Sequence, residues 1–100
     1  MAKGYWIARV DVTNEDGFKP YAAANQAIFK KYGGRYVVRG GKYESQEGAA
    51  RSRNVVIEFS DYAAALACYR SPEYQANIKV RLPHSTVDFI VIEGYDGPQP

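Results

Sequence analysis

The sequence predicts an α+β fold in which helices cover one face of a four-stranded antiparallel sheet. Three observations support this: short runs of β-branched and aromatic residues, longer stretches with helical periodicity, and glycine, proline or capping residues between them. The predicted order is strand, helix, strand, strand, helix, strand, which is typical of the ferredoxin-like βαββαβ sandwich. With 100 residues, we expect a single domain over residues 1–100, with 97–100 as a tail.

The first strand and the first helix are predicted over residues 5–12 and 13–32. The segment YWIARVDV alternates between two faces, and TNED then supplies capping and first-turn acidic residues. An apolar stripe with i, i+3, i+4, i+7 spacing follows, and a glycine pair ends the helix. Pro20 lacks an amide hydrogen, so we expect either that the regular helix begins near Gly17 or that its first turn is bent.

The second half of the chain is predicted to add three strands and the remaining helices. Residues 35–40 and 54–59 read as strands joined by a long polar connection. A Ser-Asp pair then caps a helix, and the Ser-Pro pair at 71–72 starts the next one. Residues 87–93 form the last predicted strand, ahead of a turn-rich tail.

The sheet face away from the helices is predicted to be too apolar for free contact with water. Strand alternation places on it Ile7, Val37, Val56, Ile90 and Ile92, together with Arg9, Arg39 and Glu58. A second copy of the same sheet is the simplest cover, since two-fold symmetry lets one self-complementary patch bury itself. We therefore expect a homodimer.

Four segments carry a resemblance to a known family: KGYWIARVDVT, KYGGRYVVRGG, NVVIEFSDYAAALACYRSPEYQ and EGYDG. Across nearly the whole chain the sequence resembles the domain of unknown function 1330 family, most specifically over residues 55–75. The resemblance implies a dimeric α/β barrel, in which ferredoxin-like subunits pair sheet to sheet. It implies no reaction, because the better-known relatives include cofactor-free monooxygenases, small isomerases and haem enzymes. Gly17 and Pro20 depart from the expected helix formers.

Arg9, Arg39 and Glu58 are the candidate catalytic residues, because they are predicted on the strand face that lines the dimer interior. A charge buried there is costly unless it is paired and hydrogen-bonded. One interpretation is a structural ion pair between Glu58 and an arginine on a neighbouring strand. The other is that these groups face a small anionic or carbonyl ligand.

Asn25, Tyr69 and His84 are the candidate ligand-binding residues. Asn25 lies within the apolar stripe of the first helix, so its amide needs a backbone group, a buried tyrosine hydroxyl or a ligand as partner. Tyr69 follows helical spacing and is expected in the core or in a cavity wall. His84 lies at a helix-to-strand junction, as a solvated loop residue or a general acid or base. Cys68 is expected to be a small buried packing residue.

Two functions remain open from the sequence. The first is a cofactor-independent enzyme that acts on a small apolar or aromatic metabolite in a cavity between sheet and helices. The second is a non-catalytic dimeric ligand-binding or structural module. A cavity of about 300 Å³ or more that opens onto the three candidate catalytic residues would favour the first.

The composition limits the classes of partner and cofactor that we expect for this protein. With 13 basic and 11 acidic residues and a net charge of +2, the chain has no basic block, and we expect no nucleic-acid partner. No apolar run approaches the roughly 20 residues of a membrane span, so we expect a soluble, cytoplasmic protein. One histidine and one cysteine at distant positions, without a dinucleotide fingerprint, predict no metal and no cofactor.

Overall fold

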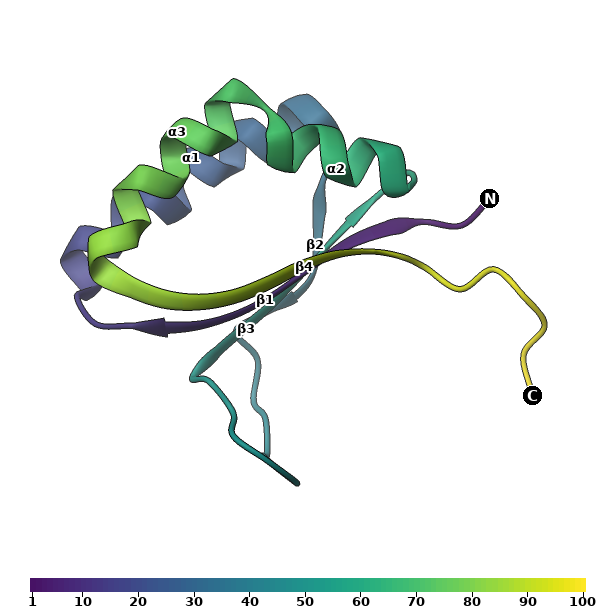
Figure 1. The fold of residues 1–100 in the computed structure, drawn as a ribbon, viewed down its shortest axis with the longest axis horizontal. Helices are drawn as coiled ribbons and strands as arrows, with labels where there is room; N and C mark the ends of the chain where they lie inside the picture. The colour runs from purple at the N-terminus through teal and green to yellow at the C-terminus, as the bar shows by residue number, and fades with distance from the viewer.

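The computed structural model describes residues 1–100 and places all helices on one face of an antiparallel sheet (Figure 1). The sheet has the strand order β2-β3-β1-β4, with bounds β1 (Gly4–Val12), β2 (Arg35–Arg39), β3 (Arg53–Phe59) and β4 (Ser85–Glu93). The helices are α1 (Glu15–Tyr32), α2 (Tyr62–Arg70), α3 (Pro72–Arg81) and the 3₁₀ turn η1 (Leu82–His84). The predicted ferredoxin-like α+β fold is confirmed. No helix has both the length and the apolar character needed to cross a membrane.

Local capping signals set the helix boundaries. The Asp61 carboxylate accepts a hydrogen bond from the amide of Ala64 at 2.7 Å, which satisfies one of the free donors at the start of α2. The Ser71 hydroxyl does the same for the amide of Tyr74 at 3.1 Å, so α3 begins directly after α2. At the end of α1, Gly33 takes the left-handed conformation with φ 77°.

The first helix is continuous from Glu15, with Pro20 inside it, so of the two expected alternatives the late start near Gly17 is wrong. Gly17 has a packing reason to be glycine. A Cβ atom there would lie 2.6 Å from the imidazole ring of His84, closer than van der Waals contact permits. The ring of His84 therefore packs against the first turn of α1.

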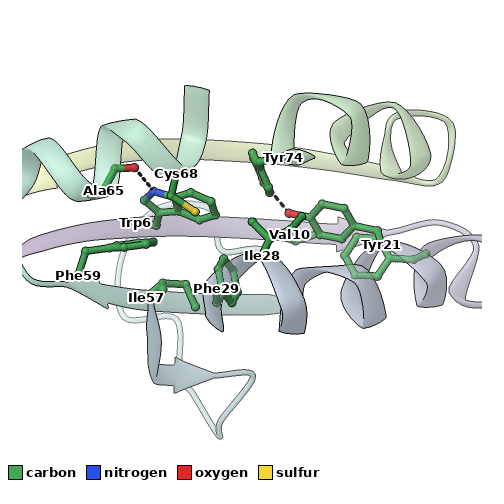
Figure 2. Packing of buried hydrophobic residues seen from close by; sticks show 11 residues of the cluster. Trp6, Val10, Tyr21, Ile28, Phe29, Ile57, Phe59, Ala65, Cys68 and Tyr74 are labelled. Carbon is green, nitrogen blue, oxygen red and sulfur yellow. Dashed lines mark hydrogen bonds between the residues drawn. The ribbon is translucent and has the colours of Figure 1, made fainter. Parts of the chain in front are cut away.

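Trp6 occupies the centre of the core, on β1, one of the two interior strands of the sheet (Figure 2). Its side chain is 2% exposed, and its indole N–H donates to the carbonyl of Ala65 in α2 at 2.8 Å. Its ring centroid lies 5.3 Å from that of Phe29 and 4.6 Å from that of Tyr74. Aromatic edges and faces thus join the sheet to α1 and α3, and the indole donor is satisfied despite burial.

The connection between β2 and β3, residues 40–52, projects from the sheet on the side away from the helices (Figure 1). Arg51, near the end of this connection, attaches it to the sheet face away from the helices, which we call the open face. That guanidinium contacts the carboxylates of Asp11 and Asp88 at 2.8 Å each, and the amide of Ser52 donates to Asp11 at 2.9 Å. Arg51 thereby links this loop to β1 and β4.

Candidate functional site

A cavity of about 400 Å³ lies between α1 and the helix-facing side of the sheet. Alternate residues of the strands form one wall, because successive strand side chains point to opposite faces. Eleven of the fourteen lining residues are hydrophobic: Trp6, Ala8, Val10, Phe18, Tyr21, Ala22, Phe29, Tyr36, Val55, Ile57 and Phe89. The other three are Arg39, Gly40 and Arg53. The cavity is therefore apolar, with two guanidinium groups as its charged boundary.

Arg39 reaches this cavity because β2 contains one extra residue. Tyr36 lies opposite Ile57, but the pairing then shifts, so that Val38 lies opposite Val56 and Arg39 opposite Val55. Such a β-bulge moves the following side chains to the other face of the sheet. The prediction that Arg39 lies on the open face is wrong for this reason, and Val37 is the unpaired residue of the bulge. Val38 takes the open-face position.

Both guanidinium groups lie over aromatic rings of the cavity wall. The guanidinium carbon of Arg39 is 4.4 Å from the ring centroid of Tyr36. That of Arg53 is 5.1 Å from the ring centroid of Phe18. Attraction between a cation and the ring face restrains each group at the cavity edge. Arg53 also reaches the carboxylate of Glu15, at a long 3.4 Å.

The tyrosine hydroxyls around the cavity are bonded within the protein. Tyr21 shares a 2.6 Å hydrogen bond with Tyr74 (Figure 2), and the buried guanidinium of Arg81 lies 5.5 Å from the Tyr21 ring centroid. Tyr36 accepts a 3.4 Å bond from the side-chain amide of Gln26. Burial raises the pKa of Tyr36 and that of Tyr74, so both phenols stay protonated at neutral pH.

Glu58 lies on the open face and is engaged in a structural ion pair. Its carboxylate accepts from the Arg35 guanidinium at 3.0 Å and from the Tyr5 hydroxyl at 3.3 Å. Arg35 lies opposite Glu58 on the neighbouring strand β2. The carboxylate therefore has its own partners and does not reach the cavity.

Arg9 shares the open face with Glu58 but does not meet it. In the β1–β3 register Arg9 lies opposite Asn54, whereas Glu58 lies opposite Tyr5. This offset of four strand positions corresponds to roughly 13 Å. The Arg9 guanidinium instead donates to the carbonyl of Ala49 at 3.0 Å. The three predicted catalytic residues consequently form no common site.

Asn25 joins two helices. It is buried, and its side-chain carbonyl accepts a 3.0 Å hydrogen bond from the amide of Asn77 in α3. The same Asn77 amide donates to the backbone carbonyl of Tyr21 at 3.1 Å. The partner is thus a second side-chain amide, and neither asparagine lines the cavity.

Tyr69 and His84 also lie outside the cavity lining. Tyr69 packs in the aromatic core, with its ring centroid 6.0 Å from that of Trp6 and 5.0 Å from that of Phe89. The backbone carbonyl of His84 accepts a 2.8 Å bond from the amide of Thr13. This contact, with its ring beside α1, connects the α3–β4 junction to the β1–α1 junction.

Arg53 is the cavity residue that sequence reasoning missed. A signal for it was present, because the alternation of Val55, Ile57 and Phe59 extends back by two residues to Arg53. The register confirms this face, since Arg53 lies opposite the buried Val10. For Arg39 the alternation itself was misleading.

Cys68 is fully buried in α2, and burial raises the pKa of its thiol to about 12. We expect Cys68→Ala and Cys68→Ser to lower the free energy of unfolding by roughly 0.5–2 kcal/mol, because only a small packed group is lost. Urea unfolding measures this change, and light scattering checks that the oligomeric state is retained. Loss of ligand binding by a folded Cys68→Ser protein would contradict this packing role.

The model of one protein family, described as a domain of unknown function (DUF1330), matches residues 3–95. No curated protein matches the chain.

Several solved structures share the fold. A protein of unknown function from Rhodopseudomonas palustris is 19% identical, with TM-score 0.69, and the match covers 96% of this chain and 85% of that one. A dimeric ferredoxin-like protein of unknown function from Jannaschia sp. CCS1 is 13% identical, with TM-score 0.69, covering 90% and 97%. SnoaB, a cofactor-independent oxygenase from Streptomyces nogalater, is 16% identical, with TM-score 0.64, covering 100% and 97%. At these identities the likeness establishes the fold alone.

Proposed function

This chain belongs to the DUF1330 family, and from that premise we propose that it is a homodimeric protein that binds a small apolar or aromatic metabolite between its sheet and α1. The observation that carries the proposal is the cavity of about 400 Å³ with eleven hydrophobic lining residues. Its volume lies within the roughly 300–1,000 Å³ of small-molecule sites. A cytoplasmic location is part of the proposal, because the fold is held by no disulfide and needs no oxidising compartment.

The shape of the walls favours a planar ligand. Phe18, Phe29 and Tyr36 contribute rings from α1 and β2, and Ala8 and Ala22 leave room between the sheet and the helix. Aromatic rings bind flat apolar molecules through offset or edge-to-face contacts, with little loss of side-chain freedom.

The open sheet face supports the homodimer. Ile90 and Ile92 are 52% and 43% exposed and Val38 is 39% exposed; Val38 and Ile7 flank the half-buried Val56 in the sheet. A contiguous apolar face of this kind marks an interaction surface. The Jannaschia protein, described as dimeric, has the same fold. In this proposal the sheet separates the interface from the cavity, so each protomer keeps its own ligand site.

A second candidate function is a cofactor-independent enzyme acting in the same cavity. It is favoured by Arg39 and Arg53, whose charges could stabilise a negatively charged oxygen that develops during reaction. The lining contains no carboxylate, histidine or thiol, so proton transfer there would depend on Tyr21, Tyr36 or the substrate itself. Binding without turnover therefore has the stronger support. Product analysis after incubation of a bound ligand in air would separate the two functions.

The binding proposal is tested by filling the cavity. We expect the uncharged fluorescent probe N-phenyl-1-naphthylamine to bind at one site per chain, and Ala22→Phe to weaken its binding at least about tenfold, because the new ring occupies the cavity. Fluorescence titration measures both affinities. Ala24→Phe is the matched control, since Ala24 is exposed on the same helix. Equal binding by the Ala22→Phe protein and the unmodified protein would refute the cavity as the binding site.

A further inference from the structure

The charged boundary of the cavity indicates which class of ligand it takes. We infer that the ligand is a planar apolar monoanion, a carboxylate or a comparable acid, whose charged end lies between Arg39 and Arg53. This inference rests on the proposed binding function and adds the chemical class of the ligand.

The two arginines are placed to act on one group. Arg39 lies opposite Val55, and Arg53 precedes Val55 by two residues on the same strand face. Such diagonal neighbours in an antiparallel pair have Cα atoms roughly 7–8 Å apart, within reach of long side chains. Both guanidinium groups lie over rings of the cavity wall, Arg39 over Tyr36 and Arg53 over Phe18. One carboxylate at the cavity edge can contact both.

The donors of these two guanidinium groups are largely unused. The Arg39 guanidinium makes no hydrogen bond and no ion pair within the chain, and the Arg53 guanidinium makes only the 3.4 Å contact with Glu15. Arginines on the opposite face differ: Arg35 and Arg51 contact carboxylates at 3.0 Å and 2.8 Å. A guanidinium carries five N–H donors in a fork that matches a carboxylate. Most donors of the two guanidinium groups that line the cavity are therefore free to bind a ligand.

The charges at the cavity edge match a single negative charge. Arg39 and Arg53 contribute +2, and Glu15, the one carboxylate in contact with either, contributes −1, leaving +1. A monoanion neutralises this sum, whereas a dianion would leave an excess negative charge beside an apolar wall. The apolar body of the ligand then occupies the remainder of the cavity.

The test compares two probes of the same shape, 2-naphthoate and 2-naphthamide, by isothermal titration calorimetry. We expect the unmodified protein to bind 2-naphthoate at least about tenfold more tightly than the amide, because charge-assisted hydrogen bonds are the stronger kind. Arg39→Gln should remove about tenfold of the 2-naphthoate affinity and leave the amide within twofold. The preference should also shrink as salt is raised, since Arg39 is exposed and Arg53 is half-buried.

Arg35→Gln is the matched control, because Arg35 belongs to the same strand but contacts Glu58 on the other face. It should change neither affinity by more than twofold. If both probes bind equally, or if Arg39→Gln weakens both alike, the monoanion inference is wrong while the binding function stands. If neither probe binds, but N-phenyl-1-naphthylamine binds and is lost in Ala22→Phe, the inference also fails alone. If none of the three binds, the proposed function fails with it.

Discussion

Val56→Asp is expected to convert the proposed homodimer into a folded monomer. Val56 lies in the middle of the open face, opposite Ile7 on β1 and opposite Val38 on β2. A carboxylate there would be desolvated at the interface, on the same strand face as Glu58, at a cost of several kcal/mol. Since about 1.4 kcal/mol is a tenfold change, the dimer should weaken at least about a hundredfold.

Multi-angle light scattering over a range of protein concentrations measures this effect. Asparagine has nearly the same size as aspartate but carries no charge, so Val56→Asn should weaken the dimer less than Val56→Asp. Ala63→Asp adds the same charge on the exposed surface of α2 and should leave the dimer intact. A monomeric mass for the unmodified protein at micromolar concentration, or a dimeric Val56→Asp protein that is still folded, would refute the sheet-to-sheet interface.

Trp6→Ala is expected to lower the free energy of unfolding by about 3–5 kcal/mol, a large fraction of the roughly 5–15 kcal/mol available to a domain. The side chain is 2% exposed and packs against rings from α1, α3 and β4. Its removal also leaves the Ala65 carbonyl without the indole donor. Urea unfolding followed by circular dichroism gives the change.

The exposed Tyr95 provides the comparison. Its side chain is 72% exposed, so Tyr95→Ala should change stability by no more than about 0.5 kcal/mol. Should Trp6→Ala fail to fold, Trp6→Phe keeps an aromatic ring and loses the hydrogen bond, with an expected loss of about 1–3 kcal/mol. A change below 1 kcal/mol in Trp6→Ala would show that Trp6 is not the centre of the core.

Local sequence signals were sufficient to predict the helices and strands and to identify most of their buried faces. Asp61 and Ser71 each bind an amide three residues ahead, and such a cap acts within one turn whatever surrounds it. The apolar stripe of α1 and the alternation of β1 are also short-range patterns. Phe18 belongs to this stripe, and Trp6 and Val10 to the strand face opposite Ile7 and Arg9, and the structure buries all three in the core.

The candidate site depended on information that is not local. One bulged residue in β2 moved Arg39 from the open face to the cavity, and nothing within RYVVRG distinguishes the two registers. The sequence suggested that Glu58 pairs with an arginine on a neighbouring strand. Which arginine it is follows only from the pairing of β2 with β3, which places Arg35 opposite Glu58. Asn25 accepts a hydrogen bond from Asn77, fifty-two residues away, because α1 packs on α3.

By itself, then, the sequence determined the order of strands and helices, the helix caps and the apolar face of each element except the bulged β2, because residues within a few positions of one another produce these features. Tertiary structure alone decided which charged side chains share a space. That outcome depends on strand register and helix packing, which are set by contacts between distant segments and change face with a shift of a single residue. The cavity, with Arg39 and Arg53 at its edge, exists only at this level.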